Sequence, residues 1–131
     1  MAPVPGLVAS ESLTVDPSDT ASELGTGSVA VLATARLLTL CERAAVAAVA
    51  NHLDEGLTTV GVQVRLDHVT PCPVGCRVSA AATLEKVAGK KLYFTISAHD
   101  ERGLVAAGKV TRVIVNERDF MTKYEAEAYR A

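Results

Sequence analysis

The stretch Leu37-Leu38-Thr39-Leu40-Cys41-Glu42-Arg43-Ala44-Ala45-Val46-Ala47-Ala48-Val49-Ala50 decides the fold of this chain. It predicts a long helix that starts at Thr34 or a few residues later and ends at about Leu53. Because this helix is apolar nearly all round, we expect other structure to enclose it. Glu42 is the exception, since an ionised carboxylate is almost never fully buried without a partner. Either Glu42 pairs with Arg43 or lies on a solvated edge, or it works in a cleft.

Alternating patterns on both sides of this helix predict strands. From residue 57 onward, Val60, Val62, Val64 and Leu66 share one face. By the same parity His68 belongs to this apolar face, whereas Gly61 lies on the opposite one. Further strands are expected at 7–15, 77–87, 92–98 and 104–116, joined by turns that include glycine, and the polar tail from residue 117 allows a short helix. One strand, a long helix and four antiparallel strands predict an α+β fold, with the antiparallel sheet wrapped around one long central helix.

Size and composition limit the classes of protein that this chain can be. Its 131 residues suit a single domain over 1–131, and 49% apolar with 21% charged residues is a globular composition. A net charge of −2 and only 4% aromatic residues disfavour nucleic acid as a partner. No basic residue precedes Arg36 and no apolar run approaches ~18 residues, so we expect neither a signal peptide nor a membrane span. The expected location is cytoplasmic.

The cysteines raise the question of a metal. Cys41, Cys72 and Cys76 are odd in number and form no C-x-x-C pair, which suits reduced thiols. His68, Cys72 and Cys76 have an H-x3-C-x3-C spacing, but the connecting segment is rich in Pro and Gly and would have to fold tightly around the ion. We therefore expect neither a metal nor another cofactor.

Thr34, Glu42 and His68 are the candidate catalytic residues. Together they offer a hydroxyl, a carboxylate base and a proton carrier. Each has an ordinary structural interpretation as well: Thr34 as a helix N-cap, Glu42 as a solvated side chain and His68 as a hydrogen-bonded residue at the core edge. Eight residues of continuous helix span ~12 Å, so Thr34 and Glu42 touch only if the helix begins after Thr34 or the preceding loop folds back.

Several short segments together carry a family resemblance. They are Ala33-Thr34, Leu40-Cys41-Glu42, residues 61–68, Pro73-Val74-Gly75, Ser97-Ala98-His99-Asp100 and residues 108–112. In this order and spacing, from about residue 28 to residue 120, the chain resembles the fluoroacetyl-CoA thioesterase group of hotdog thioesterases.

The resemblance implies a hotdog fold, hydrolysis of an acyl-CoA thioester and a homodimer. It implies that Thr34, Glu42, Gly61 and His68 form the active site, and it adds Arg112 as a substrate-binding residue. Glu42 would act as general base on water or attack the carbonyl directly. Since strand parity puts Gly61 opposite His68, only its backbone or a β-bulge would bring it to the same pocket.

The chain departs from the fluoroacetyl-specific enzyme at the substrate lid. Where that enzyme carries bulky phenylalanines, residues 24–28 read Leu-Gly-Thr-Gly-Ser, so we expect weak selectivity for fluorine. Basic residues that could meet the CoA phosphates are Arg77, Lys90, Lys91 and Arg102. Two other functions stay open: a noncatalytic acyl-CoA-binding hotdog protein and a hotdog hydratase.

Overall fold

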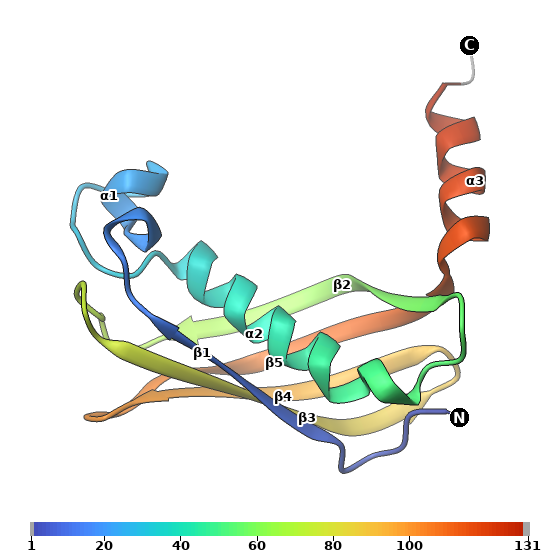
Figure 1. The fold of residues 1–131 in the computed structure, drawn as a ribbon, viewed down its shortest axis with the longest axis horizontal. Coiled ribbons are helices and arrows are strands. Elements are labelled where there is room, and N and C mark those ends of the chain that lie inside the picture. The colour runs from blue at the N-terminus through green and yellow to red at the C-terminus, as the bar shows by residue number, and fades with distance from the viewer. Residues whose placement is uncertain (1, 130–131) are drawn as a thin grey trace.

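The computed structural model describes residues 2–129 and consists of five strands and three α-helices (Figure 1). Strand β1 (Val8–Thr14) is followed by helix α1 (Ala21–Leu24) and helix α2 (Thr34–Val49). Strands β2 (Leu57–His68), β3 (Arg77–Ala88), β4 (Lys91–Asp100) and β5 (Gly103–Asn116) come next, and helix α3 (Glu117–Ala128) is the last element described. Short 3-10 turns, Pro17–Asp19 and Ala50–His52, precede α1 and follow α2.

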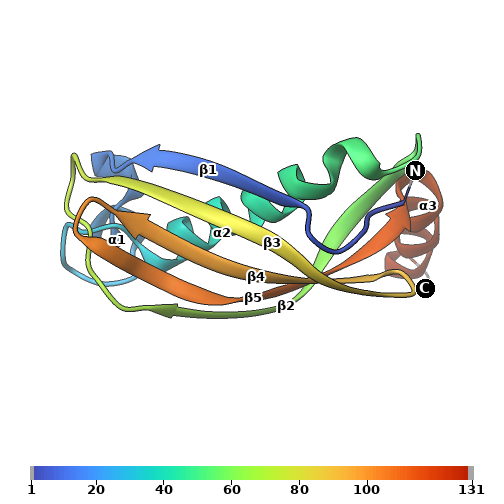
Figure 2. The same cartoon turned by 90° about the horizontal axis from the view of Figure 1, so that it is seen from below.

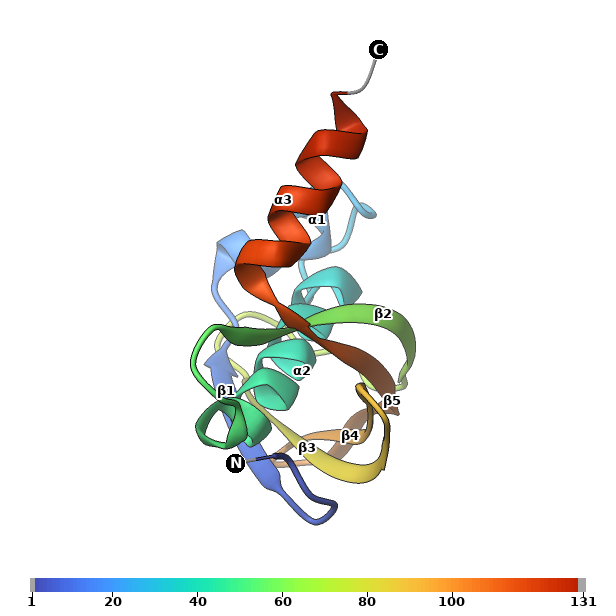
Figure 3. The same cartoon turned by 90° about the vertical axis from the view of Figure 1, so that its right-hand side faces the viewer.

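All five strands form one antiparallel sheet in the order β1-β3-β4-β5-β2, so β1 and β2 are its edges (Figure 2). Viewed end-on, the sheet curls around α2, which lies against its concave face (Figure 3). The expected antiparallel sheet around one long helix is therefore confirmed. The inward faces of β3 and β4 contribute these buried residues to the core, as the alternation predicted: Val78, Ala80, Ala82, Leu84, Leu92, Phe94, Ile96 and Ala98.

The central helix is less enclosed than its composition suggested. Leu37, Cys41, Ala44 and Ala48 face the sheet and are buried, but the opposite side of α2 is open and Val46 is 43% exposed. The exposed residues on this side mix Thr39 and Arg43 with Ala35, Val46 and Ala47, so only a short polar stretch marks the open face. The expectation that other structure encloses this helix on all sides is therefore wrong for the single chain.

Strand β2 also departs from the prediction. Its register with β5 shifts between Gly61 and Gln63, so Val62 is an extra residue in a β-bulge. The bulge reverses the parity between the two halves of the strand, so that Gly61, opposite the buried Arg112, and Val64, opposite the buried Val110, both belong to the helix side. Because β2 is an edge strand, Val62 and Val64 are still 54% and 39% exposed. An apolar edge strand of this kind is a surface for association with another strand.

Helix α3 projects away from the sheet at the end opposite to α1 (Figure 1). Asn116 caps it by accepting a hydrogen bond from the Asp119 amide at 3.0 Å, and none of its described side chains is buried. Among residues 2–129, no helix is both long and apolar enough to cross a membrane.

Candidate active site

Thr34 and His68 meet at the start of the central helix. Thr34 is the first residue of α2 and His68 is the last residue of β2. The Thr34 Oγ1 atom lies 2.9 Å from His68 Nδ1, and His68 Nε2 lies 3.0 Å from the carbonyl oxygen of Thr70. Ala33, not Thr34, occupies the N-cap position, so the N-cap interpretation of Thr34 is wrong.

These contacts assign the roles of the imidazole nitrogens. A carbonyl oxygen only accepts, so Nε2 of His68 carries a proton and donates it to Thr70. In the neutral ring Nδ1 is then an acceptor, and the Thr34 hydroxyl donates to it. A hydroxyl bonded to a base that a third group orients is the arrangement found in nucleophilic and proton-relay sites.

The pair opens into a pocket of about 480 Å³. Its walls come from α1, the segment before α2 and the loop after β2: Ala21, Thr26, Val31, Leu32, Thr34, Ala35, His68, Val69 and Pro71. Thr26 belongs to the glycine-rich stretch at 24–28, where Gly25 ends α1 with a φ of 76°. The stretch expected to act as a lid therefore lines the same pocket as Thr34 and His68, and it contributes no aromatic side chain there.

Glu42 lies in a second cluster, two turns further along α2. Its Oε2 atom accepts a hydrogen bond from Nη1 of Arg112 at 2.9 Å, and its side chain is 35% exposed. Arg112, on β5, is 7% exposed and is held by Thr59, which accepts from Nε and Nη2 at 2.9 Å each. Glu42 thus pairs with a buried arginine from the sheet rather than with the neighbouring Arg43.

Gly61 makes room for this ion pair. A Cβ atom at Gly61 would lie 2.9 Å from Glu42 Oε2 and 3.2 Å from Arg112 Nη1. The bulge at residues 61–63 explains how this glycine reaches the helix side of the sheet although the strand sequence suggested the opposite face. Gly61 therefore contacts the Glu42 cluster, while His68 contacts Thr34.

The five candidates form two groups within one chain. Thr34 and His68 form one group, and Glu42, Gly61 and Arg112 form the other. Since α2 runs without a break from Thr34 to Val49, the eight residues between Thr34 and Glu42 correspond to about 12 Å along the helix. The preceding loop does not fold back to join them.

Sequence reasoning missed the groups that orient these side chains. Thr59 and the carbonyl of Thr70 gave no signal beyond a polar residue inside a strand and a loop backbone atom. Asp19, which is 8% exposed, accepts from Arg36 Nε at 3.0 Å and so connects the turn before α1 to α2. Each partner lies on a segment whose position only the fold determines.

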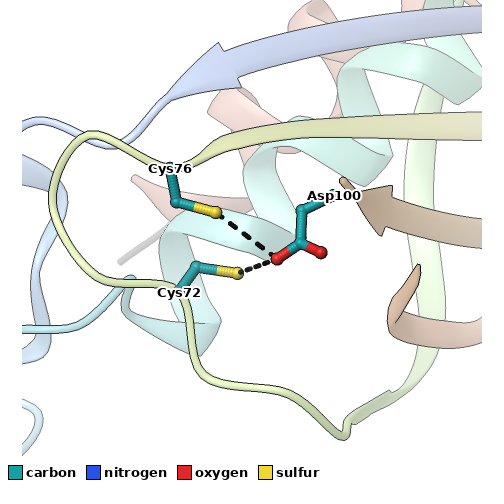
Figure 4. Close-up of side chains that lie close together, drawn as sticks. All are labelled: Cys72, Cys76 and Asp100. Carbon is teal, nitrogen blue, oxygen red and sulfur yellow. Dashed lines mark hydrogen bonds between the residues drawn. The ribbon is translucent and has the colours of Figure 1, made fainter. Parts of the chain in front are cut away.

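The H-x3-C-x3-C pattern does not assemble, because both ring nitrogens of His68 are engaged with Thr34 and Thr70. Cys72 and Cys76 instead face Asp100 at the end of β4 (Figure 4). Arg102, one of the basic residues considered for CoA, is held in this cluster through Asp100 and the carbonyl of Pro71.

Comparison with known proteins gives the class of this protein. Residues 15–118 match the family model described as fluoroacetyl-CoA-specific thioesterase. The fluoroacetyl-CoA thioesterase of Streptantibioticus cattleyicolor is 31% identical over 93 residues, covering 71% of this chain and 67% of the relative.

Solved structures of thioesterases are also similar to this chain. A point variant of the fluoroacetyl-CoA-specific thioesterase has a TM-score of 0.89 at 26% identity, covering 97% of this chain and 98% of its own. A Thermus thermophilus protein described as a thioesterase superfamily member has the same TM-score at 28% identity, covering 98% and 96%. The fold and these relatives define a thioesterase of the hotdog class. More narrowly, the chain belongs to the fluoroacetyl-CoA-specific thioesterase family.

Proposed function

We propose that this thioesterase hydrolyses an acyl-CoA to the free acid and CoA, with Glu42 as base or nucleophile assisted by His68 and Thr34. The observation that carries the proposal is the hydrogen bond of 2.9 Å between the Thr34 hydroxyl and His68 Nδ1 at the mouth of a pocket. A resting hydroxyl bonded to an unprotonated imidazole nitrogen is ready to pass a proton. The family to which the chain belongs supplies the thioester as substrate class.

The chemistry needs an activated oxygen more than a strong acid. The thiolate of CoA is a good leaving group, since a thiol has a pKa near ~8.5. Attack forms a C–O bond at the thioester carbonyl, collapse of the intermediate breaks the C–S bond, and the departing thiolate takes up one proton. In this scheme the proton comes from the attacking water: Glu42 takes it, His68 Nδ1 receives it through the Thr34 hydroxyl, and His68 then returns it to the thiolate.

Glu42 supplies the attacking or base function. Arg112 donates a hydrogen bond to one carboxylate oxygen, Oε2, and fixes its position, so that the carboxylate has a defined direction. If the carboxylate attacks directly, an anhydride forms and water then cleaves it; if the carboxylate acts as base, water attacks in one step. Arg112 thereby contributes to substrate turnover by orienting Glu42.

The start of α2 is suited to hold the developing oxyanion. Ala33 provides no side-chain cap, so the first amide N–H groups of the helix, beginning at Thr34, have no side-chain acceptor at the N-cap. Backbone donors at a helix N-terminus stabilise negative charge, and this end of α2 borders the pocket that contains Thr34 and Ala35.

A complete site in this proposal requires a homodimer. The carboxylate of Glu42 and the Thr34–His68 pair are too far apart along α2 to act together within one chain. Pairing of β2 with the β2 strand of a second copy would cover Val62 and Val64, which are 54% and 39% exposed, and would place the two groups of each copy at one interface. We also infer a cytoplasmic location, because three free cysteines suit a reducing compartment.

A thiol-release assay across acyl-CoAs of increasing chain length tests the activity. The proposal predicts stoichiometric free CoA and free acid from wild-type protein. Saturable acyl-CoA binding without CoA release would show a binding protein instead. Addition of water to an enoyl-CoA with the thioester intact would show a hydratase.

Complementation tests the shared site. Glu42→Gln and His68→Ala are each expected to be inactive homodimers with wild-type melting temperatures. After mixing and subunit exchange, mixed dimers hold one site with both substitutions and one with neither. Activity should therefore return to about a quarter of wild type, because half of the dimers are mixed and each has one intact site. No recovery, with exchange verified by native mass spectrometry, would place the whole site within one chain.

A further inference from the structure

Cys72, Cys76 and Asp100 form a cluster that the proposed hydrolysis does not use. We propose that these three side chains bind a soft divalent cation of the Zn²⁺ class, independently of the thioesterase site. Cys72 lies in the loop between β2 and β3, Cys76 directly precedes β3, and Asp100 ends β4. Their sulfur and oxygen atoms all lie within 4.8 Å of one another (Figure 4).

The distances between the donor atoms fit a tetrahedral ion. Asp100 Oδ2 lies 3.4 Å from Cys76 Sγ and 3.8 Å from Cys72 Sγ. With Zn–S near 2.3 Å and Zn–O near 2.0 Å, two tetrahedral ligands of these types are about 3.5 Å apart. The ion would therefore replace the two thiol protons that now point at Oδ2, with little movement of the heavy atoms.

The backbone already holds both cysteines in place. The carbonyl of Cys72 accepts from the Leu32 amide at 2.7 Å, and the carbonyl of Cys76 accepts from the Val15 amide at 2.8 Å. The Gly75 amide in turn donates to the Val15 carbonyl at 2.8 Å. Because two other segments of the chain fix this turn, binding would not have to fold it around the ion, which was the objection raised by its Pro and Gly content.

The charges balance when a divalent ion binds. Two thiolates and one carboxylate exceed the ion's charge by one, and the Arg102 guanidinium supplies the missing positive charge. Its Nη2 atom lies 2.6 Å from Asp100 Oδ2 and 4.0 Å from Cys72 Sγ. The Arg102 amide and Nε also donate to Asp100, at 2.8 and 3.0 Å, and so orient the carboxylate.

The protonation states of the three side chains determine how many protons leave when the ion binds. Hydrogen bonds from Arg102 lower the pKa of Asp100 to about 2, so its carboxylate is already charged. Burial is the main cause, and the neighbouring Cys76 the next, that raises the pKa of Cys72 to about 11. Burial also raises the pKa of Cys76. Each ion bound at neutral pH therefore releases two thiol protons. A hollow of about 440 Å³ beside Cys76, Asp100 and His99 gives the ion a path and water a fourth coordination position.

The types of ligand determine which ion the site prefers. Thiolate ligands favour Zn²⁺ and other soft ions over Mg²⁺ or Ca²⁺, which prefer all-oxygen sites. The bound ion would connect the loop after β2 to the end of β4. That loop carries Thr70, whose carbonyl orients His68, so occupation should raise the melting temperature of the whole chain.

The test uses the full chain, reduced and freed of metal, with Co²⁺ as the probe. We expect one Co²⁺ per chain, a thiolate-to-cobalt charge-transfer band and loss of that band when Zn²⁺ is added. Cys76→Ser and Asp100→Asn should each weaken Co²⁺ binding by at least about 100-fold. Loss of a group that only orients a metal ligand weakens metal affinity by up to about 100-fold, and loss of a ligand itself should cost at least as much. Cys41→Ala removes the third thiol, in α2, and should leave binding unchanged.

A second measurement needs no variant. In wild-type protein, Zn²⁺ should protect Cys76 from alkylation, and a chelator that removes the Zn²⁺ should make Cys76 reactive again. Cys41 is the internal reference in the peptide map. Absence of the charge-transfer band, a band that survives Cys76→Ser and Asp100→Asn, or binding only at millimolar Co²⁺ would overturn the proposal. Oxidation gives a further check: the reduced, metal-loaded protein is exposed to a mild disulfide oxidant. Thiolates bound to the ion resist this exchange, so a Cys72–Cys76 disulfide as the sole product would also overturn the proposal.

Discussion

Gly61→Ala is the substitution that most sharply tests the use of the Glu42 carboxylate. The added Cβ would lie 2.9 Å from Glu42 Oε2, whereas ordinary van der Waals contact begins at 3.4 Å. The carboxylate must therefore move by about 0.5 Å, against the hold of Arg112. A misplacement of 1 Å costs about 10²-fold in rate, so half of that shift predicts a loss of about 10-fold in kcat/KM.

The fold should tolerate this change. Gly61 does not have a positive φ, so alanine suits its backbone, and the reduced freedom of the unfolded chain offsets part of the strain. We expect a nearly unchanged melting temperature, a loss carried mainly by kcat, and a larger loss for Gly61→Val. Ser97→Ala, on the outer face of β4, is the control. A Gly61→Ala enzyme with kcat/KM within twofold of wild type would refute the argument that the position of Glu42 governs the rate.

Three further predictions follow from the site and its surroundings. His68→Ala should lower kcat by at least ~10²-fold, and its combination with Glu42→Gln should lose little more than either alone; additive losses would mean that the two residues work separately. The ratio of kcat/KM for fluoroacetyl-CoA to that for acetyl-CoA should stay below about 10⁴, because the stretch at 24–28 adds no aromatic wall to the pocket; a higher ratio would assign fluorine recognition to another element. Asp100 has its pKa lowered to about 2 by Arg102, so it stabilises the fold above its usual pKa near ~3.9 and loses that effect as pH falls toward 2. Urea midpoints should therefore fall over this range in wild type and change less for Asp100→Asn, whereas equal slopes would contradict the role of the ion pair.

The regular parts of the fold were predictable from local pattern. Period-two alternation gave the inward faces of β3 and β4, since both strands are central and have one buried side. The same rule failed in β2, where a bulge at residues 61–63 reverses the alternation and an edge position leaves the valines exposed. Gly61 inside the strand allows a bulge, but the partner strand and the helix behind it determine where the extra residue fits.

The sequence named the candidate residues, but it could not show how the fold groups them. Glu42 was conspicuous because it interrupts an apolar helix, yet its partner Arg112 lies 70 residues away on β5. Likewise, His68 met Thr34 across 34 residues, and the atom that orients it is a backbone carbonyl, which carries no sequence signal. Contacts between distant segments depend on register, so single-sequence patterns named the residues while the fold paired them.

Release of free CoA by wild type and Glu42→Gln, measured side by side on the same acyl-CoA, tests the central claim most directly. Glutamine preserves the size of the side chain and an acceptor oxygen for Arg112, but it cannot act as base or nucleophile. The account predicts turnover by wild type and a loss of at least ~10²-fold in the variant, with an unchanged melting temperature. Equal rates of CoA release from the two folded proteins would contradict it.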